Sequence, residues 1–181
     1  MTDAPAGLAP KHAAFAIAAL ATAALDRIAK ACVVHAIEPG SSVDVVRGFF
    51  SITHVRNPGA AFGFLASSSP ELRGMLFATA AAAALLVILV HLRAVARGER
   101  REPVALGLVA GGAVGNAIDR LPLIGSGEVV DFLYFDLWQG YAWPHFNLAD
   151  VAIVVGVVVL LVDMLAREAV SRGIDADESR R

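Results

Sequence analysis

Amide and carboxylic acid side chains recur at short spacing in the C-terminal half of this 181-residue chain. Asn116 and Asp119 are three residues apart. Asn147 and Asp150 repeat that spacing, and Asp131 stands between the two pairs among apolar residues. If each pair is helical, its amide and its acid occupy the same helix face. Two carboxyl groups brought together in a poorly solvated site cannot both ionise cheaply, so one keeps its proton at neutral pH.

A carboxyl pair that shares one proton can hydrolyse a peptide bond. The ionised acid takes a proton from water while the protonated acid donates to the scissile carbonyl, and the two titrate as a coupled pair. These acids are predicted near one membrane face instead of forming a relay across it, which favours a hydrolase. From the residues alone, a proton- or cation-coupled membrane transporter and a non-catalytic membrane scaffold stay open as alternatives.

Other candidate nucleophiles and metal ligands fit less well. The serines at 67–69 match a helix cap and loop, and His145 has no neighbouring serine or cysteine in a recognisable catalytic arrangement. The single cysteine, Cys32, cannot form an internal disulfide and is expected to be an inert thiol. The scattered histidines lack the spacing of a zinc site. We expect no metal ion and no cofactor.

The composition predicts that lipid surrounds these residues. Hydrophobic residues make up 57% of the chain and charged residues 18%, whereas a water-soluble domain carries about 25% charged residues. A net charge of -2 provides no basic surface for nucleic acid. The length favours one integral membrane domain over residues 1–181, in contact with membrane lipids and with no obligate protein partner evident.

Hydrophobic segments long enough to cross a bilayer as helices occur four times, at roughly 13–36, 72–92, 104–119 and 146–165. The first segment includes Asp26 and Lys30, whose i,i+4 spacing predicts an ion pair. A cleaved signal peptide is the less favoured reading of that segment, because the later segments already require a multispanning protein. Ser69, Pro70 and Glu71 provide the cap, the proline and the first-turn acid that begin a helix.

Two patterns inside the later segments predict packing and pairing. Gly107, Gly111 and Gly115 recur every four residues and share one helix face, which another helix backbone can approach closely. Asp163 and Arg167 are four residues apart and are predicted to form a solvated ion pair before a charged tail.

The connecting segments predict an outer side and an inner side. Residues 38–69 are polar and glycine-rich, with a β-like pattern from Val43 to Val55, and residues 121–145 form a loop rich in aromatic side chains. Cations gather at the opposite ends of the spans, at Lys11, at residues 93–101 and in the C-terminal tail. By the positive-inside rule both termini are cytoplasmic. The predicted fold class is an all-α membrane protein of four transmembrane helices with a small extracytoplasmic β-like lobe.

Blocks of sequence in this order resemble the lipoprotein signal peptidase family, also called signal peptidase II. The blocks are Leu25-Asp26 with Lys30, NPGAAF at 57–62, GGAVGNAIDR at 111–120, Val130-Asp131-Phe132 and FNLAD at 146–150. Each block is weak by itself, but together they extend from the first span to the last and are highly specific. Arg27 and Ala29 depart from the uncharged polar residues expected beside Asp26, and the 121–128 stretch is slightly longer than usual in the family.

The resemblance implies an aspartic endopeptidase of the bacterial cytoplasmic membrane with its active site near the outer face. Its substrate would be a diacylglyceryl-modified prolipoprotein, cut just before the lipidated cysteine. Asp131 and Asp150 would be the catalytic dyad, whereas the residues alone also allow Asp119 as a member of the pair. Residues implied to shape the site and hold substrate are Asp26, Asn57, Asn116, Asp119, Arg120 and Asn147. The glycine face of the third span would let a lipid-modified substrate helix approach.

Overall fold

The structure is a computed structural model that describes residues 10–59, 68–96, 98–121, 126–138 and 141–178, with side chains to residue 172. Parts of three predicted features lie outside the described residues. These parts are residues 60–67 of the predicted lobe, residues 122–125 and 139–140 of the predicted outer loop, and the last three residues of the NPGAAF block.

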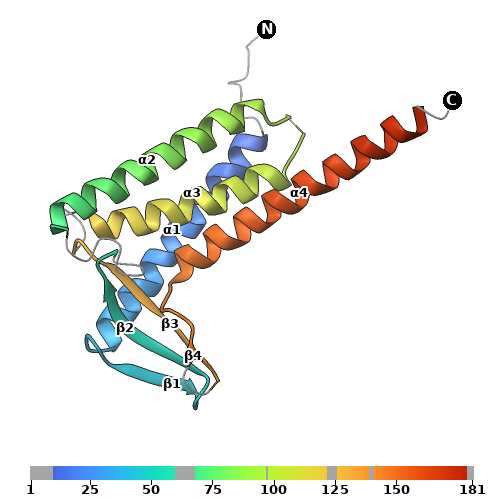
Figure 1. The fold of residues 1–181 in the computed structure, drawn as a ribbon. Coiled ribbons are helices and arrows are strands. Elements are labelled where there is room, and N and C mark those ends of the chain that lie inside the picture. The colour runs from blue at the N-terminus through green and yellow to red at the C-terminus, as the bar shows by residue number, and fades with distance from the viewer. Residues whose placement is uncertain (1–9, 60–67, 97, 122–125, 139–140, 179–181) are drawn as a thin grey trace, which may run out of the picture.

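Helices cover each of the predicted membrane segments (Figure 1). They are α1 (Pro10–Ala36), α2 (Pro70–Ala94), α3 (Arg101–Arg120) and α4 (Leu148–Glu178). The Ser69 hydroxyl accepts a hydrogen bond from the backbone N–H of Leu72, as expected for the cap of α2. The fourth helix differs in its bounds from the predicted segment, since α4 begins after Asn147 and extends beyond residue 165 to Glu178.

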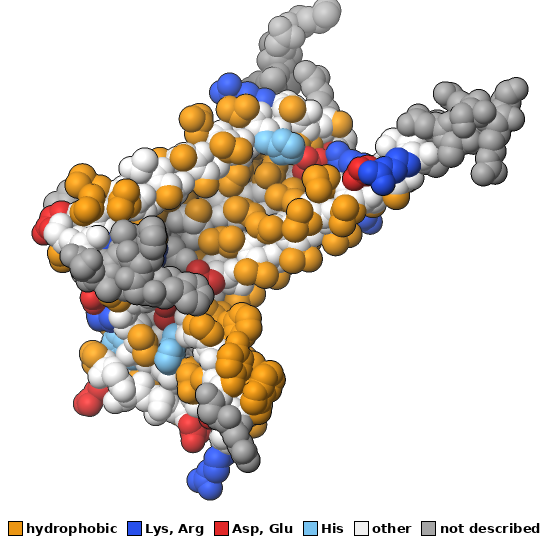
Figure 2. Space-filling view, in the orientation of Figure 1, with side chains coloured by type: hydrophobic (Ala, Val, Ile, Leu, Met, Phe, Trp, Pro, Cys, Tyr) orange, Lys and Arg blue, Asp and Glu red, His pale blue; other side chains and the backbone are white. Residues whose placement is uncertain are grey.

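The outer surfaces of α2 and α4 are apolar. Each of these helices contains a stretch long and apolar enough to cross a bilayer, and only 11% of that stretch in α2 and 17% in α4 is buried within the protein. Large side chains such as Leu86 and Val158 face outward. Figure 2 shows hydrophobic side chains across the helical face, with charged side chains toward its two ends. Lipid, and not water, suits such a surface.

A small antiparallel sheet lies at one end of the helices (Figure 1). Its strands, in the order β1-β2-β3-β4, are β1 (Ser42–Val46), β2 (Phe50–Asn57), β3 (Val129–Trp138) and β4 (Tyr141–Ala142). The predicted mostly helical fold with a β-like lobe is confirmed. The prediction of a loop over residues 121–145 is wrong, because this segment contains β3, which pairs with β2. The first four residues of β3 are all buried, so the strand lacks the alternation that would have revealed it.

The central helix α3 contacts α1, α2 and α4. Its glycines allow these close approaches. A Cβ atom at Gly111 would lie 2.5 Å from the carbonyl oxygen of Ala19 in α1, and Gly107 and Gly115 also face α1. A Cβ atom at Gly112 would likewise lie 2.5 Å from the carbonyl oxygen of Ala149 in α4. The predicted helix–helix contact is confirmed, but α1 occupies this face, so the expectation that a substrate helix approaches it is wrong.

Polar contacts tie the helices together at the end away from the sheet. Glu102 of α3 accepts a hydrogen bond from Arg167 of α4 at 2.7 Å and lies 2.6 Å from Nε2 of His91 in α2. The predicted pairing of Arg167 with Asp163 is wrong, because Arg167 pairs with Glu102 instead. The sequence rule for i,i+4 pairs considers one helix only, and here a carboxylate on a neighbouring helix competes.

Lys11 binds the end of α2. Its Nζ donates hydrogen bonds to the carbonyl oxygens of Arg93 and Val95 at 3.0 and 2.5 Å. A cation at this position satisfies backbone acceptors that the helix itself leaves without a partner. Lys11 is buried in this contact. It also adds one positive charge to the cationic end of the helices.

Candidate active site

The predicted acids meet where the helices join the sheet. Asp119 lies near the end of α3, Asp131 lies near the start of β3, and Asp150 lies in the first turn of α4. Two positions differ from the prediction. Asp131 belongs to a strand and not to a loop, and Asn147 precedes α4 instead of lying within it.

Asn147 and Asp150 form a reciprocal cap at the start of α4. The backbone N–H of Asn147 donates to Oδ2 of Asp150, and the backbone N–H of Asp150 donates to Oδ1 of Asn147, both at 3.1 Å. This arrangement resembles a capping box, in which the cap and the third helical residue satisfy each other's backbone. It holds the Asp150 carboxyl group at a helix N-terminus, where negative charge is favourable.

Asn147 also binds the second acid, Asp131. Its Nδ2 donates to Oδ1 of Asp131 at 2.7 Å, and Asn57 of β2 donates to Oδ2 of Asp131 at 2.9 Å. Asn147 is fully buried, and Asp131 is 3% exposed. One asparagine thus contacts both carboxyl groups and sets their relative position.

The side-chain amide of Asn116 in α3 also binds Asp150. Nδ2 of Asn116 donates to Oδ1 of Asp150 at 2.8 Å, and Oδ1 of Asn116 accepts from Nδ2 of Asn147 at 3.1 Å. Each oxygen of the two acids therefore has a neutral N–H donor. Within the part of the chain that the structure describes, neither Asp131 nor Asp150 forms an ion pair.

Burial raises the pKa of the Asp131 carboxyl group to about 6. The hydrogen bonds from Asn57 and Asn147 oppose this increase, and the nearby charge of Asp150 adds to it. A carboxyl group with a pKa in this range changes protonation state readily near neutral pH, which is the property a proton-transferring acid needs.

A second polar layer lies behind the amides and contains Lys30 of α1. The Lys30 Nζ atom lies 2.8 Å from carboxylate oxygens of Asp26 and Asp119, and it donates to Oδ1 of Asn116 at 2.8 Å. Lys30 is 1% exposed and Asp26 is fully buried. The predicted ion pair of Asp26 with Lys30 is confirmed. Lys30 was absent from the predicted site residues, although its spacing from Asp26 was a signal for it.

Asp26 and Arg27 connect this second layer to other helices. Oδ1 of Asp26 accepts a hydrogen bond from the backbone N–H of Ala149 at 3.0 Å, which fixes the start of α4 against α1. Arg27, the departure from the family pattern, forms an ion pair with Asp119. Asp119 consequently has two cationic partners, Arg27 and Lys30, whereas Asp131 and Asp150 have none among the residues that the structure describes.

Arg120 follows Asp119 and faces α2. Its guanidinium lies 4.3 Å from the ring centre of Phe77, and its Nη1 donates to the carbonyl oxygen of Asn116. Arg120 also lines a cleft of about 470 Å³ between α2 and the end of α3, together with Met75 and Ala78. Most of the surface of this cleft is apolar.

Over the described residues, no three His, Cys, Asp or Glu side chains are grouped in a way that could hold a metal ion. Cys32 is exposed on the surface of α1. The polar groups that the structure brings together here are the acids, the amides and Lys30 described above.

Known proteins resemble this chain over most of its length. A family model described as "Signal peptidase (SPase) II" matches residues 18–166. The lipoprotein signal peptidase of Geobacter metallireducens is 40% identical over 159 residues, covering 88% of this chain and 94% of that protein. The corresponding protein of Geobacter sulfurreducens is 42% identical, with 88% and 96% covered. A solved bacterial membrane enzyme shares 30% identity, with a TM-score of 0.72 over 84% of this chain and 87% of that structure. The chain therefore belongs to the signal peptidase II family.

Proposed function

We propose that this protein removes the signal peptide from diacylglyceryl-modified prolipoproteins, cutting before the lipidated cysteine, with Asp131 and Asp150 as its catalytic dyad. Membership of the signal peptidase II family supports the reaction. The observation that carries the choice of dyad is that Asn147 hydrogen-bonds to both carboxyl groups. Asp119, the third acid that the sequence allowed, is paired with cations and is less suited to proton transfer.

The proposed mechanism uses one proton shared between Asp131 and Asp150. The ionised member takes a proton from a water molecule, whose oxygen attacks the scissile carbonyl carbon, while the protonated member donates its proton to the carbonyl oxygen. In the second step the C–N bond breaks, the nitrogen receives a proton from the dyad, and the dyad recovers a proton from a hydroxyl of the intermediate. The products are a carboxylic acid and an amine, and the dyad again holds one proton.

In this mechanism the neighbouring residues orient the dyad and do not react. Asn57, Asn116 and Asn147 hold the carboxyl oxygens by neutral hydrogen bonds, which fix position without removing charge. Lys30 in turn holds Asn116, with Asp26 and Asp119 balancing its charge. The amides are therefore proposed to act mainly on the acids, and less on the substrate backbone than the family resemblance implied.

The apolar cleft beside Arg120 is the proposed place of the diacylglyceryl group. Met75 and Ala78 of α2 line it, and these helix positions would face the bilayer, from which the lipid arrives. Arg120 joins this cleft to the site, because its guanidinium donates to the carbonyl oxygen of Asn116, whose side chain binds Asp150. A lipid held here would place the adjoining peptide bond near the dyad.

This is a membrane protein, and we propose that all four helices cross the bacterial cytoplasmic membrane as a single domain. α1 begins and α4 ends at the side opposite the sheet (Figure 1), where Lys11, Arg101 and Arg172 also lie. The positive-inside rule makes that side cytoplasmic. Both termini are then inside, and the dyad and the sheet lie at the outer face.

Cleavage of a synthetic prolipoprotein by the purified protein in lipid vesicles tests this function. We expect the diacylglyceryl-modified substrate to be cut and the unmodified substrate to be spared, with mass spectrometry showing the lipidated cysteine as the new N-terminus. Intact modified substrate, or a cut at another bond, would contradict the proposal. The transporter alternative predicts pH-driven flux in the same vesicles and no cleavage.

A further inference from the structure

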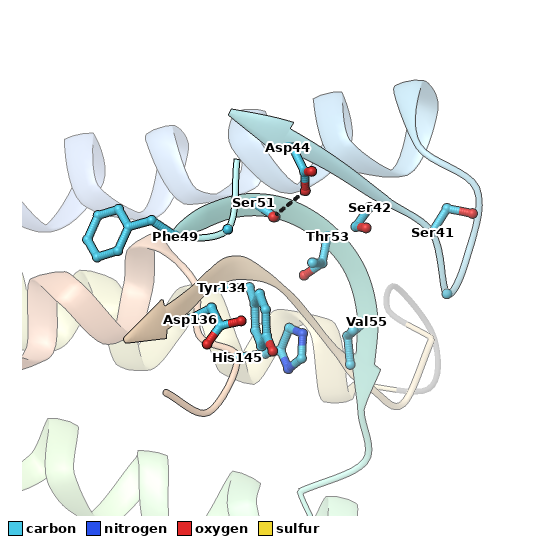
Figure 3. Close-up of a pocket in the computed structure, with 12 residues that line it drawn as sticks. Ser41, Ser42, Asp44, Phe49, Ser51, Thr53, Val55, Tyr134, Asp136 and His145 are labelled. Atoms are coloured by element: carbon cyan, nitrogen blue, oxygen red, sulfur yellow. Dashed lines mark hydrogen bonds between the residues drawn. The ribbon is translucent and has the colours of Figure 1, made fainter. Parts of the chain in front are cut away.

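Hollows outside the site differ in how they relate to the proposed dyad. A polar pocket on the sheet is lined by Tyr134 and Asp136 (Figure 3). Side chains alternate between the two faces of a strand, so these residues lie on the face of β3 opposite to Asp131. The sheet pocket is therefore separate from the dyad. A hollow between the helices has a closer relation to it.

This hollow, which we call the helix crevice, has a volume of about 450 Å³ and lies between α2, α3 and α4 at their end away from the sheet. Most of its surface is apolar, and its wall includes Val87 and His91 of α2, Leu106 of α3, and Leu160, Asp163 and Met164 of α4. α2 and α4 both pack on α3, and within the described residues they make at most marginal contact with each other. The crevice therefore opens toward the bilayer between these two helices, where Val87 is 67% and Met164 is 56% exposed.

Asp163 is a carboxylate in this apolar wall, and it forms no ion pair among the described residues. Arg167, its predicted partner, also lines the crevice but pairs with Glu102. These two charges cancel, so Asp163 leaves the crevice with one negative charge while His91 is neutral. In the proposed topology Asp163 lies about 22 Å from the outer end of α4, within a hydrocarbon core of roughly 30 Å. A carboxylate at this depth is costly without a partner, which favours a cationic occupant.

One face of α4 leads from the proposed dyad to the crevice. Asp150, Val157 and Met164 are each seven residues apart, so their side chains lie along the same face of the helix. Val157 is 40% exposed, which leaves this apolar stripe accessible from the bilayer. Asp163 precedes Met164 and lies about 20 Å along the helix from Asp150.

A face of α2 leads the same way. Phe77, Ala84 and His91 are also spaced by seven residues. The ring centre of Phe77 lies 4.3 Å from the guanidinium of Arg120, beside the site, whereas His91 lines the crevice. Ala84, between them, is exposed and small. An apolar segment can therefore lie between α2 and α4, from the dyad to the crevice.

We propose that the helix crevice receives the N-terminal end of the signal peptide, where Asp163 binds the cationic side chain that precedes the apolar segment. This inference rests on the proposed function and concerns how the same substrate is selected. A signal peptide has a cationic N-terminal region followed by about 7–15 apolar residues. An apolar helix of about 13 residues spans roughly 20 Å, the separation of Asp150 and Asp163 along α4. The apolar stripe thus matches the apolar segment, and the negative charge at its end matches the cation.

Two lipidated substrates test this inference, with lysine in one and glutamine in the other directly before an apolar segment of about 13 residues. In micelles of an uncharged detergent, we expect the wild-type kcat/KM to be about fivefold higher for the lysine substrate, the factor for about 1 kcal/mol. The difference should lie in KM, because the cation is remote from the dyad. In Asp163→Asn the ratio should fall close to one. Both rates come from one preparation, so the ratio does not depend on the folded fraction.

Glu168→Gln provides the matched control, because Glu168 is an exposed acid of the same helix that pairs with Arg172 and does not line the crevice. This variant should keep the wild-type ratio. A wild-type ratio near one, or an unchanged ratio in Asp163→Asn, would overturn the inference and leave the crevice to a membrane lipid, while cleavage of both substrates upholds the proposed function. A wild-type protein that cuts neither substrate would contradict the proposed function itself.

The position of the lysine tests the geometry separately. Lengthening the apolar segment by about seven residues moves the cation by roughly 10 Å, beyond the reach of Asp163. The preference of the wild-type protein for lysine should then disappear, and Asp163→Asn should make no further difference. An equal preference for lysine at both lengths would indicate a general attraction of cations instead of a contact at Asp163, and the inference would fail.

Discussion

Polar clusters occupy both ends of the helices, and they handle their acids in opposite ways. At the end away from the sheet, the proposed inner end, Glu102 contacts His91 and the guanidinium of Arg167, which neutralises the carboxylate. At the sheet end, the proposed outer end, Asp131 and Asp150 contact only amide and backbone N–H groups among the described residues. An ion pair holds a carboxylate and suppresses its proton chemistry, whereas an amide holds it and leaves that chemistry available. These contacts suit the inner cluster to stabilising the fold and the outer cluster to the proposed proton transfer.

At the outer end, Lys30 contacts neither Asp131 nor Asp150 directly. Lys30 contacts Asp26 and Asp119, and it reaches Asp150 only through the amide of Asn116. This layering fixes the geometry with strong ionic contacts behind the site and neutral contacts within it.

Asn147→Ala should produce the largest loss of activity among the supporting residues of the outer cluster. It removes the side-chain hydrogen bonds of Asn147 to Asp131, to Asn116 and to the backbone N–H of Asp150, and keeps the backbone N–H that binds the Asp150 carboxyl group. Displacement of a catalytic group by about 1 Å costs roughly a hundredfold in rate. Steady-state kinetics should show the loss in kcat with little change in KM. His91→Gln at the inner end should keep kcat within about twofold. A kcat above about one third of the wild-type value for Asn147→Ala would argue against this role.

The raised pKa of Asp131 should make stability depend on pH. Below pH 3.8 this carboxyl group is protonated in both the folded and unfolded states, and between 3.8 and about 6 the unfolded state releases its proton first. The free energy of unfolding therefore falls by about 3 kcal/mol as pH rises through this window, and the decrease is complete above it. Asp131→Asn should remove this decrease. Thermal unfolding in micelles at pH 3.5 and 7 measures it, and identical pH slopes in both proteins would contradict it.

Gly111→Ala should destabilise the contact between α1 and α3 by about 2 kcal/mol, a typical cost of overpacking. Its Cβ atom would lie 2.5 Å from a backbone oxygen of α1 that cannot move aside easily. Gly98→Ala is the matched control, because a Cβ atom there meets nothing within 4 Å. The melting temperature should fall in the first variant and change little in the second. Equal melting temperatures would mean that the glycine face is not needed.

Glu102→Gln should have the smallest effect, a loss of about 1 kcal/mol in stability, since its partners His91 and Arg167 are more than half exposed. kcat should stay within about twofold of the wild-type value. A large loss of cleavage would show that the inner cluster also controls the reaction, and the comparison between the two ends would fail.

The helical part of the fold could be predicted because its signals are local. The apolar segments, the cap at Ser69 and the glycine spacing from Gly107 to Gly115 each depend on neighbouring residues, and the structure agrees with them. β3 could not be predicted in this way. Its pairing with β2 joins residues far apart in the sequence, and its aromatic residues resemble those of a membrane-interface loop.

The candidate site was predicted in its residue types but not in its connections. The spacing of Asn147 and Asp150 suggested a shared helix face, whereas Asn147 caps the helix and faces Asp131. Pairing rules for single helices found Asp26 with Lys30 but assigned Arg167 to the wrong acid. Contacts between different helices decide these partners, and spacing along one helix carries no information about them.

The most direct test of the dyad compares Asp131→Asn and Asp150→Asn with Glu102→Gln in the same cleavage assay. All three substitutions remove one carboxylate and keep nearly the same shape, and melting temperatures confirm that each protein is folded. We predict that each outer substitution lowers kcat by at least about a thousandfold, because peptide hydrolysis needs both acids, while the inner substitution leaves it within about twofold. Cleavage at the wild-type rate by either outer variant would contradict the assignment of Asp131 and Asp150 as the catalytic pair.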